Sequence, residues 1–280
     1  MAAKPTIQMT SASVPVVHEV EVMDEMGRLK KTHIPGERPL TIYLDKREVV
    51  TLMTLGSAPE ALVLGYLRNQ RLVESPDDIE SIQVDWETDS AAVKTRRSTV
   101  DIDALTSKRV VTTGCGQGTM FGGLIEEMDE IQLPEGPALS QEAIVTLIDS
   151  IRIHDTIYKK SGSVHACAVF ERDGNEGVRL LHFIEDVGRH HAVDSISGLM
   201  WLANKPGRDL IFFTTGRLTS EMVIKGAQMG IPFLLTRSGV TLMGLELARK
   251  TNLTILSRCS GKHFEIYNAP ERVVFSQKPQ

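Results

Sequence analysis

The sequence predicts an α/β protein in which a smaller, β-rich α+β domain precedes a larger α/β domain. The chain has 280 residues, which is enough for about two domains of roughly 150 residues each. Strand-like and helix-like segments alternate through the second half, a pattern typical of a sheet with helices on its faces. Two prolines and a glycine interrupt residues 131–139 between the halves. We therefore expect a disordered tail over 1–20, an N-terminal α+β domain over 21–136 and an α/β domain over 137–280.

In the first half, each element follows from a local pattern. Residues 1–20 are small, polar and proline-containing, which predicts a loose tail. Residues 39–55 form two apolar runs around Asp45-Lys46, which predicts two adjacent strands. Pro59 suits the first helical turn and predicts a helix over 59–73. We predict strands over 81–87 and 98–105, followed by a glycine-rich loop.

The second half begins with a helix and then alternates. Ser140 is a plausible N-cap for a helix over 141–160. Asp173-Gly174-Asn175 is typical of a hairpin turn between two strands. The remaining predicted helices and strands alternate, which predicts a largely parallel sheet. The predicted strands are 164–171, 178–185, 209–215, 231–236, 253–257 and 263–267, and the predicted helices are 191–203, 220–229 and 240–252.

Composition excludes several classes of function. The net charge of -5 and the sequence pI of about 5.9 argue against a protein that binds nucleic acid through bulk positive charge. Three scattered cysteines without a CxxC pair predict neither a disulfide framework nor a structural zinc site. We find no apolar run typical of a signal peptide or a membrane span. The expected location is therefore the cytoplasm, with no membrane partner.

Arginines follow four predicted strands of the second half. In open α/β sheets, ligands bind beyond the carboxyl ends of the strands. Three of these junctions precede a helix, whose N-terminus favours an anion, and arginine recognises phosphate bidentately. We call this group the arginine edge and expect it to bind a phosphate-rich ligand. It consists of Arg189, Arg217, Arg237 and Arg258.

Other side chains of the same junctions are further candidates for binding the ligand. They are His190, Ser220, Cys259, Ser260, Gly261, Lys262 and His263. The alternative interpretation is that the arginines are solvated or paired with neighbouring carboxylates, here Glu185, Asp186 and Glu221.

Cys115 is a candidate nucleophile. It lies between Gly114 and Gly116 after a predicted strand, so its thiol is expected to be accessible. The alternative is an inert cysteine in a mobile loop. Cys167 lies inside an alternating strand and is expected to be a small core residue, whereas the position of Cys259 leaves its role open.

Three histidines are candidates for acid–base catalysis or for ligand binding. His165 begins a strand after a flexible turn, and is either a general acid or base or a histidine satisfied at a strand end. His190 and His191 open a helix, where an imidazole can orient a ligand. No spacing of His, Cys, Asp and Glu matches a metal-ligand motif.

At these residues the sequence resembles the formate dehydrogenase accessory sulfurtransferase family, FdhD. The resemblance runs from about residue 40 to the C-terminus. The blocks that carry it are EDVGRHHAVD (185–194), TGRLTSEMVIKGAQMGIPFL (215–234), LARKTNLTIL (247–256), EIYN (265–268), PEALVLGYLRNQRLV (59–73) and GSVHA (162–166).

The resemblance implies a sulfur carrier between a cysteine desulfurase and the molybdenum cofactor, bis-molybdopterin guanine dinucleotide, which then enters formate dehydrogenase. It also implies a cytidine deaminase-like, three-layer α/β fold for residues 137–280. Deamination itself is not expected, because the PCxxC zinc-ligand pattern of deaminases is missing. A homodimer is the oligomeric state that the resemblance suggests, and GDP is the expected analogue of one end of the cofactor.

The resemblance assigns the family's site roles only to residues of this sequence that match the family's motifs. Cys115 corresponds to the cysteine that carries the persulfide, and Arg258–His263 corresponds to the cofactor-binding segment. Arg189, His190, Arg217, Ser220, Arg237 and His165 complete the expected cofactor site. Two positions depart from the family pattern. Gly118 replaces a second loop cysteine, which removes the obvious resolving thiol, and Arg258 replaces an aromatic residue.

Three functions remain open from the sequence. The first is the sulfur carrier. The second is a non-catalytic chaperone that binds and delivers the cofactor, which the missing second cysteine favours. The third is a nucleotide hydrolase or deaminase. A persulfide on Cys115 separates the first two, and turnover of free nucleotides would support the third.

Overall fold

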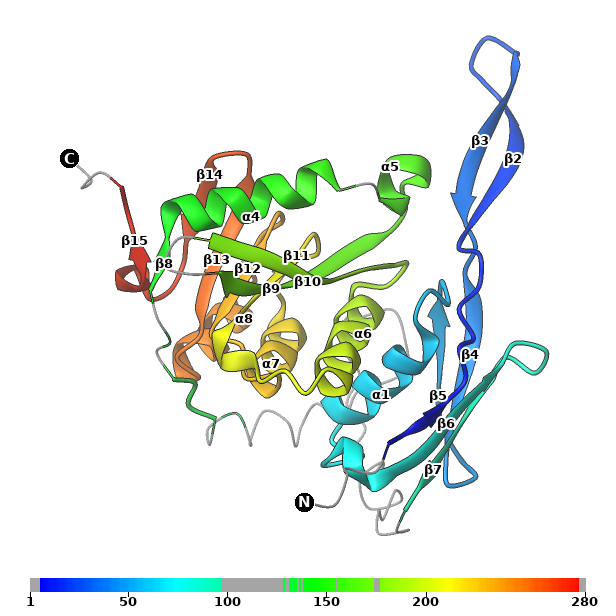
Figure 1. Cartoon of the computed structure of the whole chain (residues 1–280). Helices are drawn as coiled ribbons and strands as arrows, with labels where there is room; N and C mark the ends of the chain where they lie inside the picture. The colour runs from blue at the N-terminus through cyan, green and yellow to red at the C-terminus, as the bar shows by residue number, and fades with distance from the viewer. Residues whose placement is uncertain are drawn as a thin grey trace.

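A computed structural model describes residues 6–96, 128, 131–134, 136, 138–154, 156–173 and 177–276 (Figure 1). The described chain forms a five-stranded sheet, a six-stranded sheet and two smaller two-stranded sheets. Three of the sequence predictions fall wholly or partly outside the described residues. They are the strand at 98–105, the loop that holds Cys115 and Gly118, and the turn at Asp173-Gly174-Asn175.

The five-stranded sheet is formed by the first part of the chain, with the order β1-β6-β7-β4-β5. Its core is the apolar face that meets helix α1 (Pro59–Asn69). The predicted strand pair around Asp45-Lys46 and the helix that Pro59 begins are both confirmed. The strands are β1 (Gln8–Met9), β4 (Arg38–Leu44), β5 (Arg47–Thr54), β6 (Ile79–Asp85) and β7 (Ser90–Thr95).

The expected loose tail over residues 1–20 is wrong for the part that the structure describes. Gln8 and Met9 pair with β6, and Ile7 packs against the core of the five-stranded sheet. The Glu60 carboxylate accepts hydrogen bonds from Thr10 Oγ1 and from the Ala12 amide. These contacts fix a segment whose composition alone predicts a free end.

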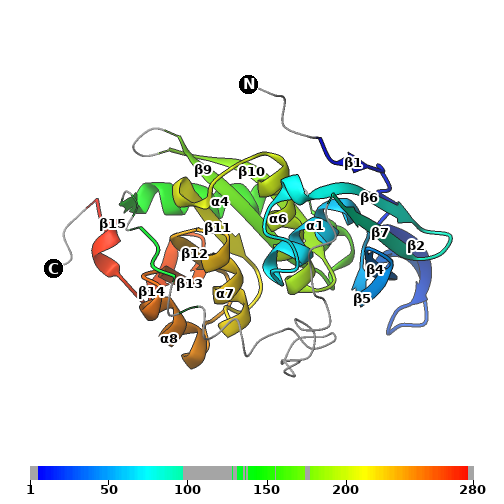
Figure 2. The ribbon, with the colours of Figure 1, turned by 90° about the horizontal axis from the view of Figure 1, so that it is seen from below.

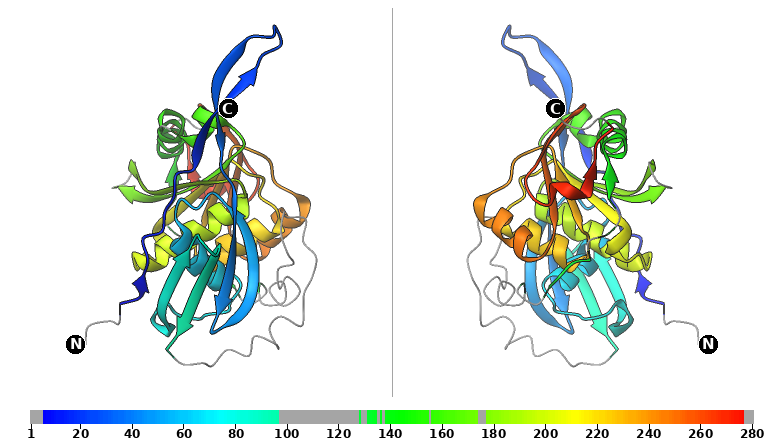
Figure 3. Two further views of the ribbon diagram at one scale, coloured as in Figure 1. Left: turned by 90° about the vertical axis from the view of Figure 1, so that its right-hand side faces the viewer. Right: turned by 90° about the vertical axis from the view of Figure 1, so that its left-hand side faces the viewer.

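A two-stranded hairpin follows and projects from the body of the molecule (Figures 1 and 3). It consists of β2 (Val17–Met23) and β3 (Leu29–Pro35), paired antiparallel. This hairpin begins inside the expected tail and was not predicted.

The six-stranded sheet has the order β10-β9-β11-β12-β13-β14 and lies between two layers of helices. Helix α4 covers one face, and α6, α7 and α8 cover the other (Figure 1). The strands are β9 (His165–Asp173), β10 (Gly177–Asp186), β11 (Leu210–Thr214), β12 (Phe233–Thr236), β13 (Thr254–Ser260) and β14 (His263–Ile266). The helices are α4 (Gln141–Ile153), α5 (Ile157–Ser161), α6 (Arg189–Leu202), α7 (Ser220–Gln228) and α8 (Leu242–Lys250).

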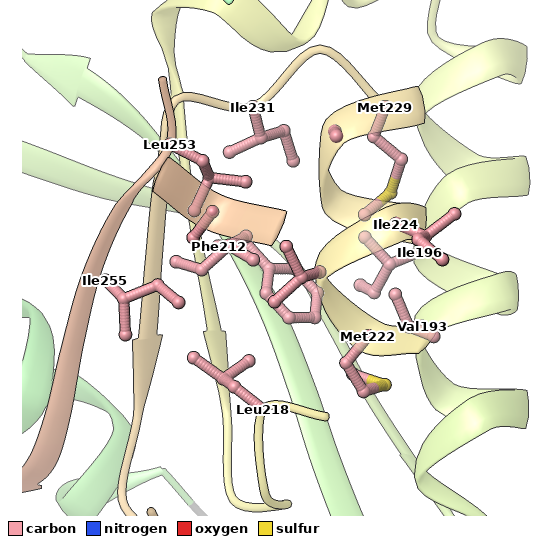
Figure 4. Packing of buried hydrophobic residues seen from close by; sticks show 14 of the residues in the cluster. Val193, Ile196, Phe212, Leu218, Met222, Ile224, Met229, Ile231, Leu253 and Ile255 are labelled. Carbon is pink, nitrogen blue, oxygen red and sulfur yellow. The ribbon is translucent and has the colours of Figure 1, made fainter. Parts of the chain in front are cut away.

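Alternate side chains of the central strands fill two cores. Ile211 and Phe213 of β11 point into the core beneath α4, whereas Phe212 points into the core beneath α6 and α7 (Figure 4). Both faces of β11 are therefore buried, which explains its continuous apolar run.

The prediction of a largely parallel sheet needs correction. β11, β12 and β13 are parallel, but β9 runs antiparallel to both β10 and β11, and β14 runs antiparallel to β13. The physical reason is the shortness of two connections: the β9–β10 and β13–β14 links are too short for a crossover and must form hairpins.

The helix predicted over 141–160 is divided into α4 and α5. Ser140 caps α4 as predicted, because its side chain accepts a hydrogen bond from the Ala143 amide. A second cap interrupts the helix: Thr156 has extended backbone angles, and its hydroxyl accepts from the Lys159 amide. Thr156 therefore starts a new helix.

Helices α1 and α6 pack side by side and join the two sheets (Figure 2). Glycines allow this close approach, because a Cβ at Gly65 would lie 1.7 Å from the Asp194 carbonyl oxygen, and one at Gly198 would lie 2.0 Å from that of Ala61. Met128 and Leu133 pack in the core of the six-stranded sheet, although both precede residue 137. The boundary between 136 and 137 stays a prediction.

Shorter elements complete the chain. The 3-10 helices are η1 (Pro76–Asp78), η2 (Gly207–Asp209) and η3 (Pro270–Arg272), and β8 (Leu139–Ser140) pairs with β15 (Val273–Val274). None of the helices in the described ranges is both long and apolar enough to cross a membrane.

Candidate functional site

Four strands of the six-stranded sheet point in one direction. β11, β12 and β13 are mutually parallel, and β10 shares their direction because β9 is antiparallel to both β10 and β11. Their carboxyl ends therefore meet at one edge of the sheet. The predicted placement of the junctions after β10, β11 and β12 on a common edge is confirmed.

The loops after β11 and β12 lie against each other at this edge. The Leu218 amide donates to the Gly239 carbonyl at 3.0 Å, and the Thr241 amide donates to the Leu218 carbonyl at 3.1 Å. These bonds hold the loop with Arg217 beside the loop with Arg237. Both arginines are exposed.

Arg189, the first residue of α6, lies next to the end of β11. A Cβ at Gly216 would lie 2.9 Å from Arg189 Cδ, so the arginine side chain passes over this glycine. Ser220 begins α7 beyond the same loop and is half-buried. Three arginines thus come from three consecutive junctions of the sheet.

His165 lies at the start of β9, close enough to these three arginines for their positive charges to affect it. Burial first, and then the positive charges of Arg189, Arg217 and Arg237, lower the pKa of His165 below its ordinary value. His165 is therefore neutral at physiological pH, which leaves one ring nitrogen as donor and the other as acceptor.

Arg258 has an unusual backbone conformation. It has a φ of 55° where the register of β13 shifts between Ser257 and Ser260. Its amide donates to the Ser238 carbonyl, and its guanidinium lies near Gly239. Arg258 thus lies within β13 rather than after it, yet it reaches the same edge. A left-handed conformation is unfavourable for a residue other than glycine and persists where the surrounding structure holds it.

The neighbouring carboxylates are bound to other donors. Glu185 accepts hydrogen bonds from the amides of Ile157 and Tyr158, at the start of α5. Asp186 accepts from Thr54 Oγ1 and from the Leu55 amide.

Glu221, the third neighbouring carboxylate, lies near a cation other than the arginines. Glu221 lies 3.9 Å from Lys225 Nζ. Arg217, Arg237 and Arg258 form no ion pair with any described carboxylate. For these three arginines, the alternative of ordinary surface pairing finds no support.

A cavity of about 270 Å³ opens beside the arginine edge, and we call it the first cavity. Its floor is apolar and includes Ile148, Phe183 and Phe213, while Glu185, Thr215 and Arg237 provide polar groups. The size is near the lower end for small-ligand pockets, which are largely apolar with a few polar groups.

The segment Arg258–His263 contributes to this cavity in part. Cys259, Ser260 and Gly261 line it, whereas Lys262 and His263 are exposed at the turn into β14. Burial raises the pKa of the Cys259 thiol to about 12, so this cysteine is not a nucleophile at neutral pH.

A second cavity, of about 330 Å³, lies between the two sheets. His165, Arg189, His190 and His191 line it, together with residues of β5. The structure thus brings three predicted site residues, His165, Arg189 and His190, into a cavity separate from the one that Cys259–Gly261 line.

The remaining cysteines differ sharply. Cys167 is fully buried in β9, as predicted, and burial raises its pKa to about 12. Cys115 lies outside the described residues, so its nucleophilic role stays a prediction.

Sequence reasoning missed Tyr158. This aromatic side chain lines the first cavity, and the Arg237 guanidinium lies 5.3 Å from its ring centroid. It was assigned to a continuous helix, and no local pattern marks it as part of a site. The Thr156 cap is the only sequence signal that could have placed Tyr158 at the start of a separate helix.

Comparison with known proteins gives a consistent result. A sequence model described as the FdhD/NarQ family matches residues 35–274. A relative named sulfur carrier protein FdhD, from Staphylococcus haemolyticus, is 26% identical over 237 residues, which is 85% of this chain and 88% of the relative. The protein of the same name from Staphylococcus aureus is 26% identical over 242 residues, which is 86% of this chain and 89% of the relative.

A solved structure is similar over nearly the whole chain. It is the crystal structure of a protein proposed to be a formate dehydrogenase accessory protein, from Desulfotalea psychrophila. The two structures superpose with a TM-score of 0.73 at 26% identity, covering 93% of this chain and all of the other.

Proposed function

The chain belongs to the FdhD/NarQ family, and from that premise we propose that it is a cytoplasmic sulfur carrier for the maturation of formate dehydrogenase. In this proposal it accepts sulfur from a cysteine desulfurase and passes it to the molybdenum cofactor, bis-molybdopterin guanine dinucleotide. The cofactor is the substrate of the transfer and then enters the dehydrogenase. The two staphylococcal relatives named sulfur carrier protein FdhD, which match over most of this chain, support the carrier role.

The observation that carries the proposal is the convergence of arginines beside the first cavity. Arg217 and Arg237 are held by adjacent loops, and Arg189 reaches the same place from α6. The guanidinium groups of Arg217 and Arg237, which form no ion pair with a described carboxylate, suit pyrophosphate, because they offer bidentate, charge-assisted hydrogen bonds. The first cavity is of a size for part of a nucleotide, and GDP is the analogue that we expect to bind there.

Cys115 is the proposed nucleophile. Its thiolate attacks the outer sulfur of the desulfurase persulfide, a new S–S bond forms on Cys115, and the desulfurase cysteine leaves as a thiolate. No net oxidation occurs in this exchange. In the second step the outer sulfur bonds to molybdenum and Cys115 leaves as a thiolate, while the metal supplies the two electrons of the new bond.

The test is mass spectrometry of the intact protein after incubation with a cysteine desulfurase and cysteine. We expect the mass of one added sulfur, located on Cys115 by peptide mapping, and its loss in Cys115→Ala. Cys167→Ser is the matched control, because Cys167 is buried and its pKa is raised. Full sulfur loading and full dehydrogenase maturation with Cys115→Ala would exclude the carrier role.

The second candidate function is a chaperone that binds and delivers the cofactor without handling sulfur. Gly118 favours it, because the family's second loop cysteine is absent and the thiols of Cys167 and Cys259 are buried. In that case GDP binding persists while Cys115 never carries sulfur, so the same two measurements separate the functions. A homodimer stays a prediction that sedimentation analysis can test.

A further inference from the structure

The hairpin of β2 and β3 projects from the body of the molecule, and most of its residues are exposed (Figures 1 and 3). We call residues 17–35 the arm. α5 packs against β3, and no other helix or strand in the described ranges makes comparable contact with the arm. A two-stranded hairpin by itself is only marginally stable in water. The arm therefore gains stability when another surface covers it.

One face of the arm has the pattern of a strand that packs against something. β2 alternates valine with glutamate, and successive side chains of a strand point to opposite faces. Val20 and Val22 share one face, whereas Glu19 and Glu21 share the other. Such alternation is typical of a strand with one packed and one solvated face, yet both valines are only half-buried. The apolar face is therefore available to a partner.

Three large apolar side chains gather at the tip of the arm. Met23 is 67% exposed, Met26 71% and Leu29 70%. Met23 pairs directly with Leu29 across the hairpin. Single exposed apolar side chains are ordinary, but a group of them marks a contact surface. Methionine suits such a surface, because its flexible side chain adapts to the shape of a partner.

The turn that presents Met26 is fixed by hydrogen bonds. The Asp24 carboxylate accepts from the amides of Met26 and Arg28, at 2.9 Å and 3.0 Å, and from Arg28 Nε at 2.9 Å. Gly27 has a φ of 74°, which suits glycine, and its amide donates to the Asp24 carbonyl. A group that is already held in its binding conformation loses less entropy on association. The tip thus presents Met26 as a preformed anchor.

The side of the arm toward α5 is basic. β3 carries Lys30 and Lys31, α5 carries Lys159 and Lys160, and all four are exposed. Lys31 also forms a salt bridge with Glu19 of β2. The net charge of the chain is -5, so this local excess of lysine stands out. It favours a partner surface that carries carboxylates.

α5 connects the arm with the first cavity. Tyr158 and Lys159 of this helix line the cavity, and the Arg237 guanidinium lies over the Tyr158 ring. A protein that sits on β3 and α5 therefore lies at the rim of the cavity where the proposed function places one end of the cofactor. This position suits the protein that receives the cofactor.

From these observations we propose that the arm and α5 form the docking surface for the protein that accepts the cofactor. The partner offers an apolar pocket for Met26, bordered by carboxylates that face the lysines of β3 and α5. The inference rests on the proposed function, because that function supplies the cofactor and its acceptor, formate dehydrogenase.

Biolayer interferometry between the full-length protein and cofactor-free formate dehydrogenase tests this surface. Met26→Asp places a charge at the tip without harming the fold, because aspartate is common in turns. We expect its dissociation constant to rise about 30-fold or more, the size of a lost hot spot. Lys30→Glu should slow association and weaken the salt dependence of binding. Leu242→Asp is the matched control with wild-type affinity, because Leu242 of α8 is also 71% exposed.

Other measurements on Met26→Asp separate this surface from the proposed function. GDP affinity and sulfur loading by the desulfurase should stay at the wild-type level, because Met26 lines neither cavity. Reduced sulfur loading with unchanged dehydrogenase binding would assign the arm to the desulfurase, and an altered sedimentation coefficient would assign it to a second copy of this chain. Either result overturns the proposal.

Two results of the binding measurement would also overturn the docking surface and leave the proposed function intact. They are wild-type affinity for the dehydrogenase in Met26→Asp, and an equal loss of affinity in Leu242→Asp. A wild-type protein that neither binds GDP nor takes up sulfur would overturn the proposed function, and this inference with it.

Discussion

Asn69 of α1 donates a hydrogen bond of 2.7 Å to the Asp194 carboxylate of α6, across the contact that joins the two sheets. The same carboxylate accepts a bond of 2.9 Å from Lys225 of α7. The Asn69 carbonyl oxygen accepts in turn from Ser197. All four residues are buried, so the network fixes how the two sheets are placed and, with them, the walls of the second cavity.

Removing the cation of this network should destabilise the protein strongly. Lys225→Met leaves the Asp194 carboxylate buried and without its counter-charge, and we expect the free energy of unfolding to fall by about 3–5 kcal/mol. Urea denaturation measures the change. The control is Lys94→Met, because Lys94 pairs with Glu80 in an exposed bridge whose loss should change stability by about 0–1 kcal/mol. Equal effects of both substitutions would mean that the buried network does not hold the sheets.

The glycine contact between α1 and α6 should tolerate no added methyl group. In Gly65→Ala the Cβ would lie 1.7 Å from the Asp194 carbonyl oxygen, a backbone atom that moves only if the helices separate. We expect a loss of about 1–3 kcal/mol or more from such overpacking. Gly226→Ala is the comparison, since the atoms nearest to its Cβ belong to the Leu234 side chain, the first of them Cδ1 at 2.8 Å, and not to a backbone. Calorimetric unfolding compares the two, and equal melting temperatures would contradict the close contact.

Arg217 should contribute to nucleotide affinity through its planar fork of donors. We expect Arg217→Ala to weaken GDP binding by about 1.5–3 kcal/mol, and Arg217→Lys to recover only part of this loss. Raising the salt concentration should weaken wild-type binding, because exposed charges are screened. Isothermal titration calorimetry provides the affinities. Arg208→Ala serves as control, because Arg208 is exposed and belongs to η2, away from the arginine edge. Wild-type affinity in Arg217→Ala would assign this arginine to the solvated surface.

Alkylation should distinguish the three cysteines. Burial raises the pKa values of the Cys167 and Cys259 thiols to about 12, so almost no thiolate exists at pH 7.5. A free cysteine has a pKa of about 8.5, and we expect Cys115 to react first with iodoacetamide. Peptide mapping after a brief reaction should find label on Cys115 alone, and denaturation should expose the other two. Label on Cys259 in the native protein would show that the first cavity admits the reagent to a reactive thiol.

Much of the six-stranded sheet could be predicted, because its strands and helices carry strong local patterns. The run 209–215 is apolar on both faces and forms β11. Pro59 at the first helical position and the Ser140 cap mark two helix starts. Strands with weak local patterns were not predicted. β7 consists of Ser-Ala-Ala-Val-Lys-Thr, and its small residues give little signal for a strand. β1 is held by its pairing with β6 and not by a pattern in its own sequence.

The candidate site could be predicted only where its charged residues come directly after a predicted strand. The arginine edge was found because strand ends mark it in the sequence, and the structure brings Arg217 and Arg237 together through the bonds of Leu218. The two cavities could not be predicted. They arise where Tyr158 and Met53 approach from elements distant in sequence, and no local spacing records such contacts.

Gly118 gives the last prediction, which concerns how long sulfur stays on Cys115. In Gly118→Cys the new thiol lies two residues beyond Gly116 and can attack the inner sulfur of the Cys115 persulfide. A disulfide then forms between the two cysteines, and the outer sulfur leaves as sulfide, so atoms and electrons balance without another reactant. Wild type has no such partner, because Cys167 and Cys259 are buried.

We therefore expect sulfur-loaded Gly118→Cys to release sulfide faster than sulfur-loaded wild type when no cofactor is present. Methylene blue detection of sulfide follows the rates, and Gly118→Ser controls for the loss of glycine itself. If Gly118→Cys and Gly118→Ser release sulfide at the wild-type rate, a thiol at this position does not act on the persulfide. Faster release by the cysteine variant alone would explain how a chain without the second cysteine retains its sulfur until the cofactor arrives.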